Sequence, residues 1–260
     1  MEMRYERQYS RQLNRDMEFK IYGHAGKPML YIPCQNGRFF DFENFRMADR
    51  LSPWIESGRL QVFSVDTMDE ESWSNSYGDC RRRIERHEQW VNYLMMEVVP
   101  QMIQRAKERN QEENPKLLTF GCSMGAMHAA NLYFRFPDVF EGGLALSGLY
   151  DAKFSFGGYM DDLVYANSPV DYLSNMPADH PYMDKYRDGR MIICVGQGAW
   201  ENETLDGTRH LDAVLKNKNI PVWVDFWGYD VSHDWDWWYR QVDYFMPKLL
   251  GEAYYSKTRK

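Results

Sequence analysis

The chain alternates short apolar runs with longer stretches in which apolar residues recur at helical spacing. Short runs rich in aliphatic and aromatic residues predict strands buried on both faces. They lie at residues 29–34, 60–67, 115–120, 141–148, 190–196 and 221–228. The stretches between them predict helices at 38–58, ended by a Ser-Pro break, 79–109, kinked by Pro100, 124–136, 203–219 and 234–251.

The N-terminal pattern is different. Residues 5–23 alternate polar and apolar side chains around a turn-like "NRD", which predicts an antiparallel hairpin with one solvated face. Downstream, buried strands that alternate with helices predict a mostly parallel central sheet flanked by helices on both faces. The predicted fold class is therefore α/β, with an antiparallel N-terminal hairpin.

No repeat, linker or low-complexity tract divides the sequence. Its length of 260 residues suits one large α/β core, so we expect a single domain over residues 1–260. Residues 149–183 show no dominant period, however. We interpret about 150–188 as a candidate cap or substrate-facing insertion.

Composition excludes several function classes. A net charge of −7 gives no electrostatic reason to bind nucleic acid or an anionic membrane, because both favour a basic patch, so we expect neither partner. Composition does not decide whether the chain forms a homo-oligomer. The four cysteines are far apart and form no CxxC pair, which argues against a zinc ribbon or a redox dithiol. Without an apolar leader or an 18-residue apolar stretch, the default expectation is the cytoplasm.

The segment "GCSMG", residues 121–125, follows a predicted strand and opens a predicted helix. This is the G-x-S-x-G nucleophile elbow in the context that the motif demands. A sharp strand-to-helix turn would expose the Ser123 hydroxyl above the sheet, and the glycines avoid the clashes of a Cβ atom. The helix N-terminus would point the Met124 amide at a developing oxyanion.

A serine nucleophile needs a base, and the base needs an orienting acid. Of the six histidines, His233 lies in the loop after the last predicted strand. Catalytic groups in open α/β sheets gather at the carboxyl ends of strands, and the chain order of such triads is Ser, acid, His. We therefore predict His233 as the base. The competing interpretation is a surface loop histidine.

The acid should follow the strand at 190–196, where "QGAWENETLDG" supplies several carboxylates. Glu201 is the preferred candidate, because the 32 positions to His233 leave room for a helix, a strand and a loop. Glu203 is the main rival, although an acidic residue in a first helical turn also suits the helix dipole. Asp206 and Asp151 are weaker alternatives.

A second oxyanion donor is expected in the loop after the strand at 29–34. Asn36 and Gly37 offer backbone N–H groups in a turn whose glycine permits close approach to a ligand. This assignment holds to one residue in either direction. The alternative interpretation of "QNG" is simply a favourable turn.

Three segments together resemble the putative-esterase family of α/β hydrolases, which includes esterase D-type S-formylglutathione hydrolases and mycolyltransferases. They are "FGCSMGAMHA" at the elbow, "CVGQGAWENET" at the acid and "GYDVSHDWDWWYRQVDYFMPKLL" at the histidine. With "YIPCQNGRFFDFENF", the likeness extends over most of the chain. It implies a single-domain α/β-hydrolase fold, a triad of Ser123, Glu201 and His233, and an oxyanion hole from Met124 and the Asn36 to Gly37 turn. The family often has Asp in a short G-x-x-D, whereas this chain supplies glutamates.

The chemistry expected of these residues is hydrolysis of a carboxylic ester or thioester through an acyl-enzyme. An acyltransferase would use the same triad, and a non-catalytic binding or scaffold protein of this fold is the third hypothesis. No H-E-x-x-H or comparable ligand set is present, so we expect no metal and no cofactor. The expected partner is a small ester substrate.

Overall fold

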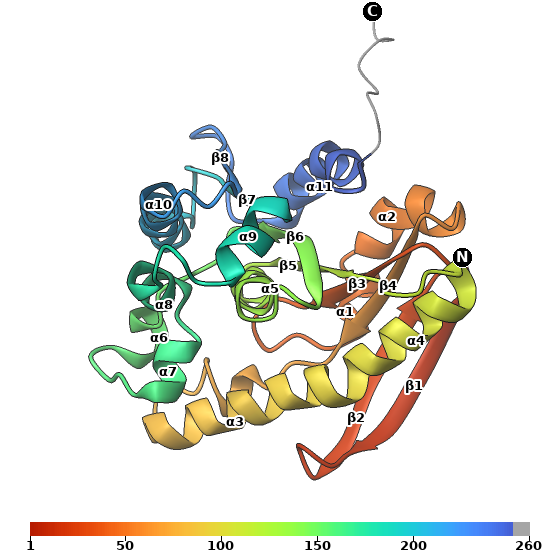
Figure 1. Ribbon diagram of the computed structural model, residues 1–260, viewed down its shortest axis with the longest axis horizontal. Helices are drawn as coiled ribbons and strands as arrows, with labels where there is room; N and C mark the ends of the chain where they lie inside the picture. Colours follow the sequence, from red (N-terminus) through yellow and green to blue (C-terminus); the bar gives the residue numbers. More distant parts are fainter. Residues whose placement is uncertain (252–260) are drawn as a thin grey trace, which may run out of the picture.

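An eight-stranded sheet forms the centre of the computed structural model, which describes residues 1–251 (Figure 1). The strand order is β1-β2-β4-β3-β5-β6-β7-β8. The strands are β1 (Met3–Ser10), β2 (Arg15–Tyr22), β3 (Lys27–Ile32), β4 (Leu60–Val65), β5 (Leu117–Cys122), β6 (Phe140–Leu146), β7 (Arg190–Val195) and β8 (Trp223–Phe226). The β1·β2 and β2·β4 pairs are antiparallel and all later pairs are parallel, which confirms the predicted α/β class and N-terminal hairpin.

Helices cover both faces of the sheet. One face packs against α3 (Cys80–Tyr93), α4 (Val99–Asn110), α5 (Met124–Arg135), α8 (Pro169–Asn175), α9 (Tyr182–Asp188) and α10 (Asn202–Asn217). The other face packs against α1 (Asp41–Asn44), α2 (Met47–Glu56) and α11 (Trp235–Leu249). Burial of these two apolar layers removes the largest share of apolar surface from water and so stabilises the three-layer arrangement.

The helix predicted at 38–58 is two helices, and the predicted Ser-Pro break is wrong. The chain breaks instead at Arg46, whose φ of 55° is left-handed, and α2 continues through Pro53 to Glu56. Proline removes one helical N–H donor, but here the Ser52 hydroxyl donates to the Asp49 carbonyl at 2.7 Å. The carbonyl that Pro53 leaves without a helical partner is therefore satisfied.

The long helix predicted at 79–109 runs continuously, with one irregular turn. Between α3 and α4 lies a π-helical turn, η2 (Leu94–Val98), which ends two residues before Pro100. The wider turn accommodates the missing proline N–H, so the predicted kink takes the form of a π turn before Pro100 and the helix continues.

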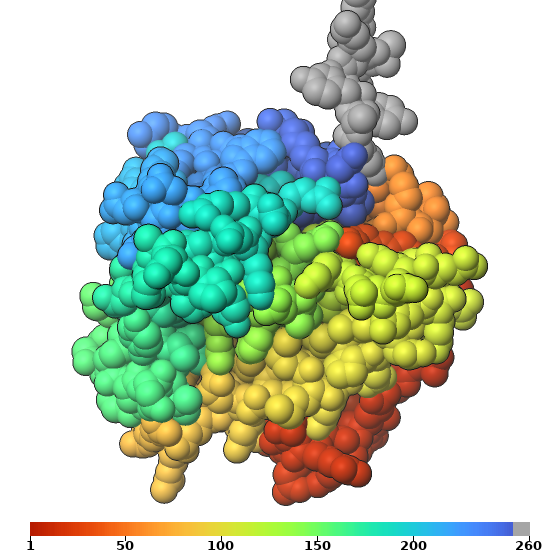
Figure 2. All heavy atoms as spheres, viewed as in Figure 1, coloured from red at the N-terminus to blue at the C-terminus, as the bar shows by residue number. Residues whose placement is uncertain are grey.

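The aperiodic segment between β6 and β7 contains short helices: α6 (Lys153–Phe156), α7 (Asp162–Ala166), α8 and α9. In Figure 2 it forms a continuous green-to-teal region of the surface. Within residues 1–251, no helix combines the length and the apolar character that crossing a bilayer requires.

Candidate active site

Ser123 occupies a strained turn between β5 and α5. Its φ of 56° and ψ of −127° lie outside the regions that ordinary residues favour. The turn needs glycine on both sides, because a Cβ on Gly121 would overlap the Gly125 carbonyl and a Cβ on Gly125 would overlap the Ile32 and Pro33 carbonyls. The strand, the tight turn and the helix together hold the serine hydroxyl at the carboxyl edge of the sheet.

His233 lies between the serine and a carboxylate. Its Nε2 is 2.9 Å from Ser123 Oγ, and its Nδ1 is 3.1 Å from Glu201 Oε2. The His233 backbone N–H donates to the Ala199 carbonyl at 2.9 Å, which ties the loop after β8 to the loop after β7. Trp238 packs edge-on against the imidazole, with ring centroids 4.9 Å apart. The ring is held in one orientation, while 19% of the side chain remains accessible.

Glu201 is almost completely buried, at 1% exposure. Its Oε1 accepts from Ser147 Oγ at 2.6 Å, and its Oε2 accepts from Thr204 Oγ1. Ser147 in turn accepts a hydrogen bond from Trp238 Nε1 at 3.1 Å. These donors hold the carboxylate in place and aim it at His233.

The structure brings Glu201, and not its rivals, to the histidine. Glu203 and Asp206 are exposed on α10. Asp151 accepts from the backbone N–H of Lys153 at the start of α6. The Ser123, His233 and Glu201 side chains therefore form a continuous hydrogen-bonded series from separate loops at one sheet edge.

The two backbone donors predicted in the early loop are used inside the protein. The Asn36 N–H donates to Asp69 Oδ2 at 3.2 Å, and the Gly37 N–H donates to the Cys34 carbonyl at 2.8 Å. Neither N–H is free for a substrate, which argues against both residues as donors. The Gln35 N–H, within the one-residue margin of the prediction, has no hydrogen-bond partner among residues 1–251. Met124 is the first residue of α5, where backbone N–H groups have no intrahelical acceptor.

Sequence reasoning missed Asp69, a carboxylate that is 2% exposed. Its Oδ1 accepts from His128 Nε2 at 2.9 Å. The position of His128 on the helix after the elbow predicts an exposed or packing role. The side chain is buried and packed, and it also makes this bond, which was not predicted. The partners of Asp69 lie 33 and 59 positions away, so no local signal in the sequence could have revealed the cluster.

The thiols beside the site are poor nucleophiles. Burial raises the pKa of Cys34 to about 12 and raises the pKa of Cys122 well above its ordinary value. A thiol with a raised pKa holds little reactive thiolate at neutral pH. Among residues 1–251, no group of three or more His, Cys, Asp or Glu side chains is arranged to hold a metal ion.

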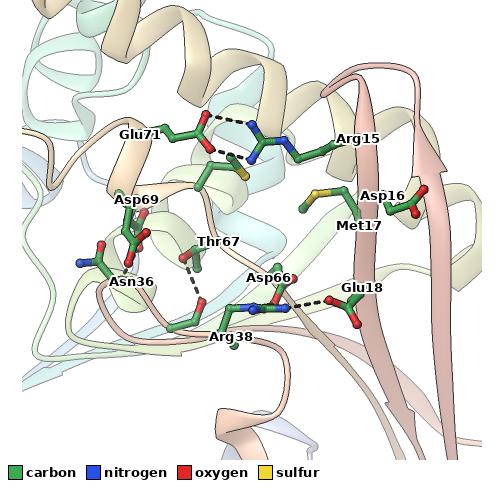
Figure 3. Close-up of a pocket in the computed structure, with 13 residues that line it drawn as sticks. Arg15, Asp16, Met17, Glu18, Asn36, Arg38, Asp66, Thr67, Asp69 and Glu71 are labelled. Atoms are coloured by element: carbon green, nitrogen blue, oxygen red, sulfur yellow. Dashed lines mark hydrogen bonds and ion pairs between the residues drawn. The ribbon is translucent and has the colours of Figure 1, made fainter. Parts of the chain in front are cut away.

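A charged cavity of about 430 Å³ adjoins the early loop (Figure 3). Its lining includes Asn36 and Asp69, but Ser123, His233 and Glu201 do not contribute to it. Arg15 in its wall pairs with Glu71 at 2.6 Å, and Arg38 pairs with Asp66 at 2.9 Å. The cavity therefore lies beside the triad and not over it, and these wall charges are mutually compensated.

Comparison with known proteins identifies the family of this chain. The model of the family described as "Putative esterase" matches residues 10–248. A search of the curated proteins found no match. A ferulic acid esterase structure is 15% identical, with a TM-score of 0.73 and coverage of 96% of this chain and 98% of that chain.

Two further solved structures are also similar. An S-formylglutathione hydrolase from Agrobacterium tumefaciens is 15% identical, with a TM-score of 0.67 and coverage of 96% of this chain and 93% of that chain. Mycobacterium tuberculosis MPT51 is 14% identical, with a TM-score of 0.67 and coverage of 96% and 99%. The match of the family model over most of the sequence shows that this chain belongs to the esterase family, a family of carboxylic ester hydrolases with the α/β-hydrolase fold.

Proposed function

We propose that this chain hydrolyses a carboxylic ester or thioester with Ser123 as nucleophile, His233 as general base and Glu201 as the orienting acid. The observation that carries the proposal is the hydrogen-bonded series in which His233 lies 2.9 Å from Ser123 Oγ and 3.1 Å from Glu201 Oε2. Both distances lie within the reach that proton transfer needs.

The reaction proceeds in two halves. His233 Nε2 takes the hydroxyl proton as Ser123 Oγ bonds to the substrate carbonyl carbon, and the carbonyl oxygen becomes an oxyanion. The carbon–oxygen or carbon–sulfur bond of the leaving group then breaks, and His233 returns the proton to the departing alcohol or thiol. Water repeats these steps on the acyl-enzyme, so that the acid is released and the serine hydroxyl is restored.

Two backbone N–H groups are the proposed oxyanion donors: Met124 at the start of α5, and Gln35. The Cys34 carbonyl accepts from Gly37, and in a planar trans peptide the following N–H points the opposite way. The Gln35 N–H therefore points out of the turn. The Ile32 and Pro33 carbonyls lie against Gly125, so the loop passes directly beside the first turn of α5.

The segment between β6 and β7 supports a substrate-facing role. It leaves β6 at the same sheet edge as Ser123, and Phe154, Tyr159 and Met160 are exposed on it. Such apolar side chains suit the acyl or aromatic part of an ester. We assign this segment, about residues 150–188, as the candidate wall of the substrate site.

A panel of p-nitrophenyl esters of increasing chain length tests the proposal, with Ser123→Ala as the control and a fluorophosphonate probe as a second readout. We expect wild-type turnover and labelling at Ser123, and neither in the variant. Equal hydrolysis by both proteins, or no labelling of Ser123 when a control hydrolase is labelled, would contradict it. Product analysis with an added alcohol distinguishes hydrolysis from acyl transfer.

A further inference from the structure

The Asp69 carboxylate joins two elements that are separate in the sequence. Asp69 begins the short 3-10 helix η1 (Asp69–Glu71) after β4. One of its oxygens accepts from the Asn36 backbone N–H at 3.2 Å, and the other accepts from His128 Nε2 at 2.9 Å. Figure 3 shows Asp69 directed at Asn36 from the neighbouring loop. Because Asp69 is only 2% exposed, water cannot replace either partner at low cost.

Each partner of Asp69 belongs to a segment that carries a proposed oxyanion donor. Asn36 directly follows Gln35. His128 lies four residues after Met124 on α5, and residues four apart lie on the same helix face. The carboxylate therefore connects the loop that carries one donor to the helix that carries the other.

We propose that Asp69 and His128 form a clamp that positions the two oxyanion donors against each other. This inference rests on the proposed function. Asp69 and His128 are positioning residues, because they would act through the backbone of Gln35 and Met124 without touching the substrate.

The early loop needs such an anchor. Gln35 and Asn36 are both exposed, and Asn36 has a left-handed φ of 58°. Apart from Asp69, the turn is held by the Gly37 N–H to the Cys34 carbonyl, by Ser74 Oγ to Asn36 Oδ1 at 2.5 Å and by Thr67 Oγ1 to the Gly37 carbonyl at 3.1 Å. The turn bond orients the peptide before Gln35, and the Asp69 bond orients the peptide after it. Loss of the second bond would free the peptide that follows Gln35, so that Gln35 would be held from one side only and its N–H would be positioned less firmly.

The helix side of the clamp is rigid. The His128 ring is 2% exposed and packs between His87 and Trp90, with both pairs of ring centroids 5.1 Å apart. Trp73 closes a third side at 6.2 Å. His87 is equally buried, but its Nε2 lies 3.1 Å from Asn167 Oδ1 and makes no bond to Asp69. The two stacked histidines thus offer a matched pair of variants, one inside the clamp and one beside it.

The test compares Asp69→Asn, His128→Ala and His128→Gln with His87→Ala as the control. Glutamine can place an amide N–H where His128 Nε2 donates, so it should restore part of the activity. Loss of one oxyanion donor costs about 10²–10³-fold in kcat, and a displaced donor costs less. We expect kcat to fall about 10- to 100-fold in Asp69→Asn and His128→Ala, with KM changed less than about threefold.

Inhibitor binding separates positioning from a general loss of stability. A trifluoromethyl ketone forms a tetrahedral oxyanion on the serine, whereas the matching methyl ketone binds mainly as the ground state. We expect the clamp variants to weaken only the first inhibitor, and His87→Ala to weaken neither. Concentrations of active sites are taken from fluorophosphonate titration, so that unfolded protein does not count.

The outcomes separate two failures. If the wild type neither hydrolyses esters nor binds the trifluoromethyl ketone, the proposed function is wrong. If the wild type does both, and the clamp variants match His87→Ala in kcat and inhibitor affinity per active site, the clamp is wrong. Should Asp69→Asn not fold, the comparison of His128→Gln with His128→Ala decides the same question, because only the former retains a donor to Asp69.

Discussion

Two buried carboxylates in this protein each bind a histidine, and their surroundings differ in one decisive respect. Glu201 binds His233, which remains 19% accessible and reaches Ser123 Oγ at 2.9 Å. Asp69 binds His128, and both side chains are only 2% exposed. A carboxylate–histidine pair can transfer a proton where it adjoins a nucleophile and is accessible to substrate. Where both are missing, the same pair can only stabilise the fold.

Replacing the two histidines is the strongest test of this comparison. We expect His233→Ala to lower kcat by about 10⁴-fold or more, because the serine loses its base, whereas His128→Ala should cost about 10- to 100-fold. Steady-state kinetics on one activated ester measures both. His210→Ala, on the exposed side of α10, is the control and should leave kcat unchanged. Similar losses at His233 and His128 would remove the distinction.

The acids should differ in the same direction. In a serine protease triad, changing the acid to its amide costs about 10⁴-fold, because the imidazole then takes the wrong tautomer. We expect Glu201→Gln to lower kcat by about 10³- to 10⁴-fold. Glu203→Gln is a matched control two residues away, since Glu203 is exposed. If Glu203→Gln were the more damaging substitution, the acid would have to be reassigned.

A smaller effect should come from the donors that hold Glu201. Thr204→Val keeps the shape of the side chain but removes the hydroxyl that donates to Glu201 Oε2. We expect kcat to fall about 3- to 10-fold, which corresponds to the loss of about 1 kcal/mol. Thr208→Val is the control, because that buried hydroxyl on the same helix has no hydrogen-bond partner within residues 1–251. Equal kinetics in the two variants would show that Thr204 does not position the acid.

The pH dependence of the free energy of unfolding should show the effect of His87, the buried histidine beside the clamp. Burial lowers the pKa of His87 well below its ordinary value, and the neighbouring His128 and Arg135 lower it further. Below about pH 6.5 this histidine binds a proton in the unfolded chain but not in the folded protein. The free energy of unfolding should therefore be unaffected by His87 above that pH and should decrease as the pH falls below it. The slope from one such group is at most about 1.4 kcal/mol per pH unit.

His87→Gln removes this titration and should flatten the decline. Urea unfolding of both proteins between pH 7 and pH 5 gives the two curves. Parallel curves for wild type and variant would mean that His87 is not the group responsible.

The proposed nucleophile could be predicted from local context, and the proposed base from its order in the chain and its place after a strand. Ser123 and Met124 lie within one short motif at a strand-to-helix turn. His233 followed from chain order and from the convergence of parallel strands at one edge. The sequence also favoured Glu201 over Glu203 as the acid. Two glutamates so close in the chain can be distinguished only by the direction in which each side chain points.

The early loop, which carries one proposed oxyanion donor, shows where the sequence stops being informative. "QNG" predicts a turn, and a turn is present. Which N–H points outward depends on the orientation of each peptide plane, and the Gly37 bond to Cys34 and the Asp69 bond to Asn36 decide that orientation. The break at Arg46 in place of Ser52-Pro53 is a similar case, because the Ser52 hydroxyl compensates for the missing donor.

The sequence by itself determined the α/β class and the hairpin, and it predicted Ser123, His233 and Glu201 as candidates, because periodicity and short motifs are properties of neighbouring residues. Only the tertiary structure decided that Glu201 is the carboxylate bound to His233, that Asn36 and Gly37 use their N–H groups internally, and that Asp69 joins His128 to the early loop. Those outcomes depend on burial and on contacts across dozens of positions. The sequence pattern gives neither the burial of a side chain nor its long-range contacts.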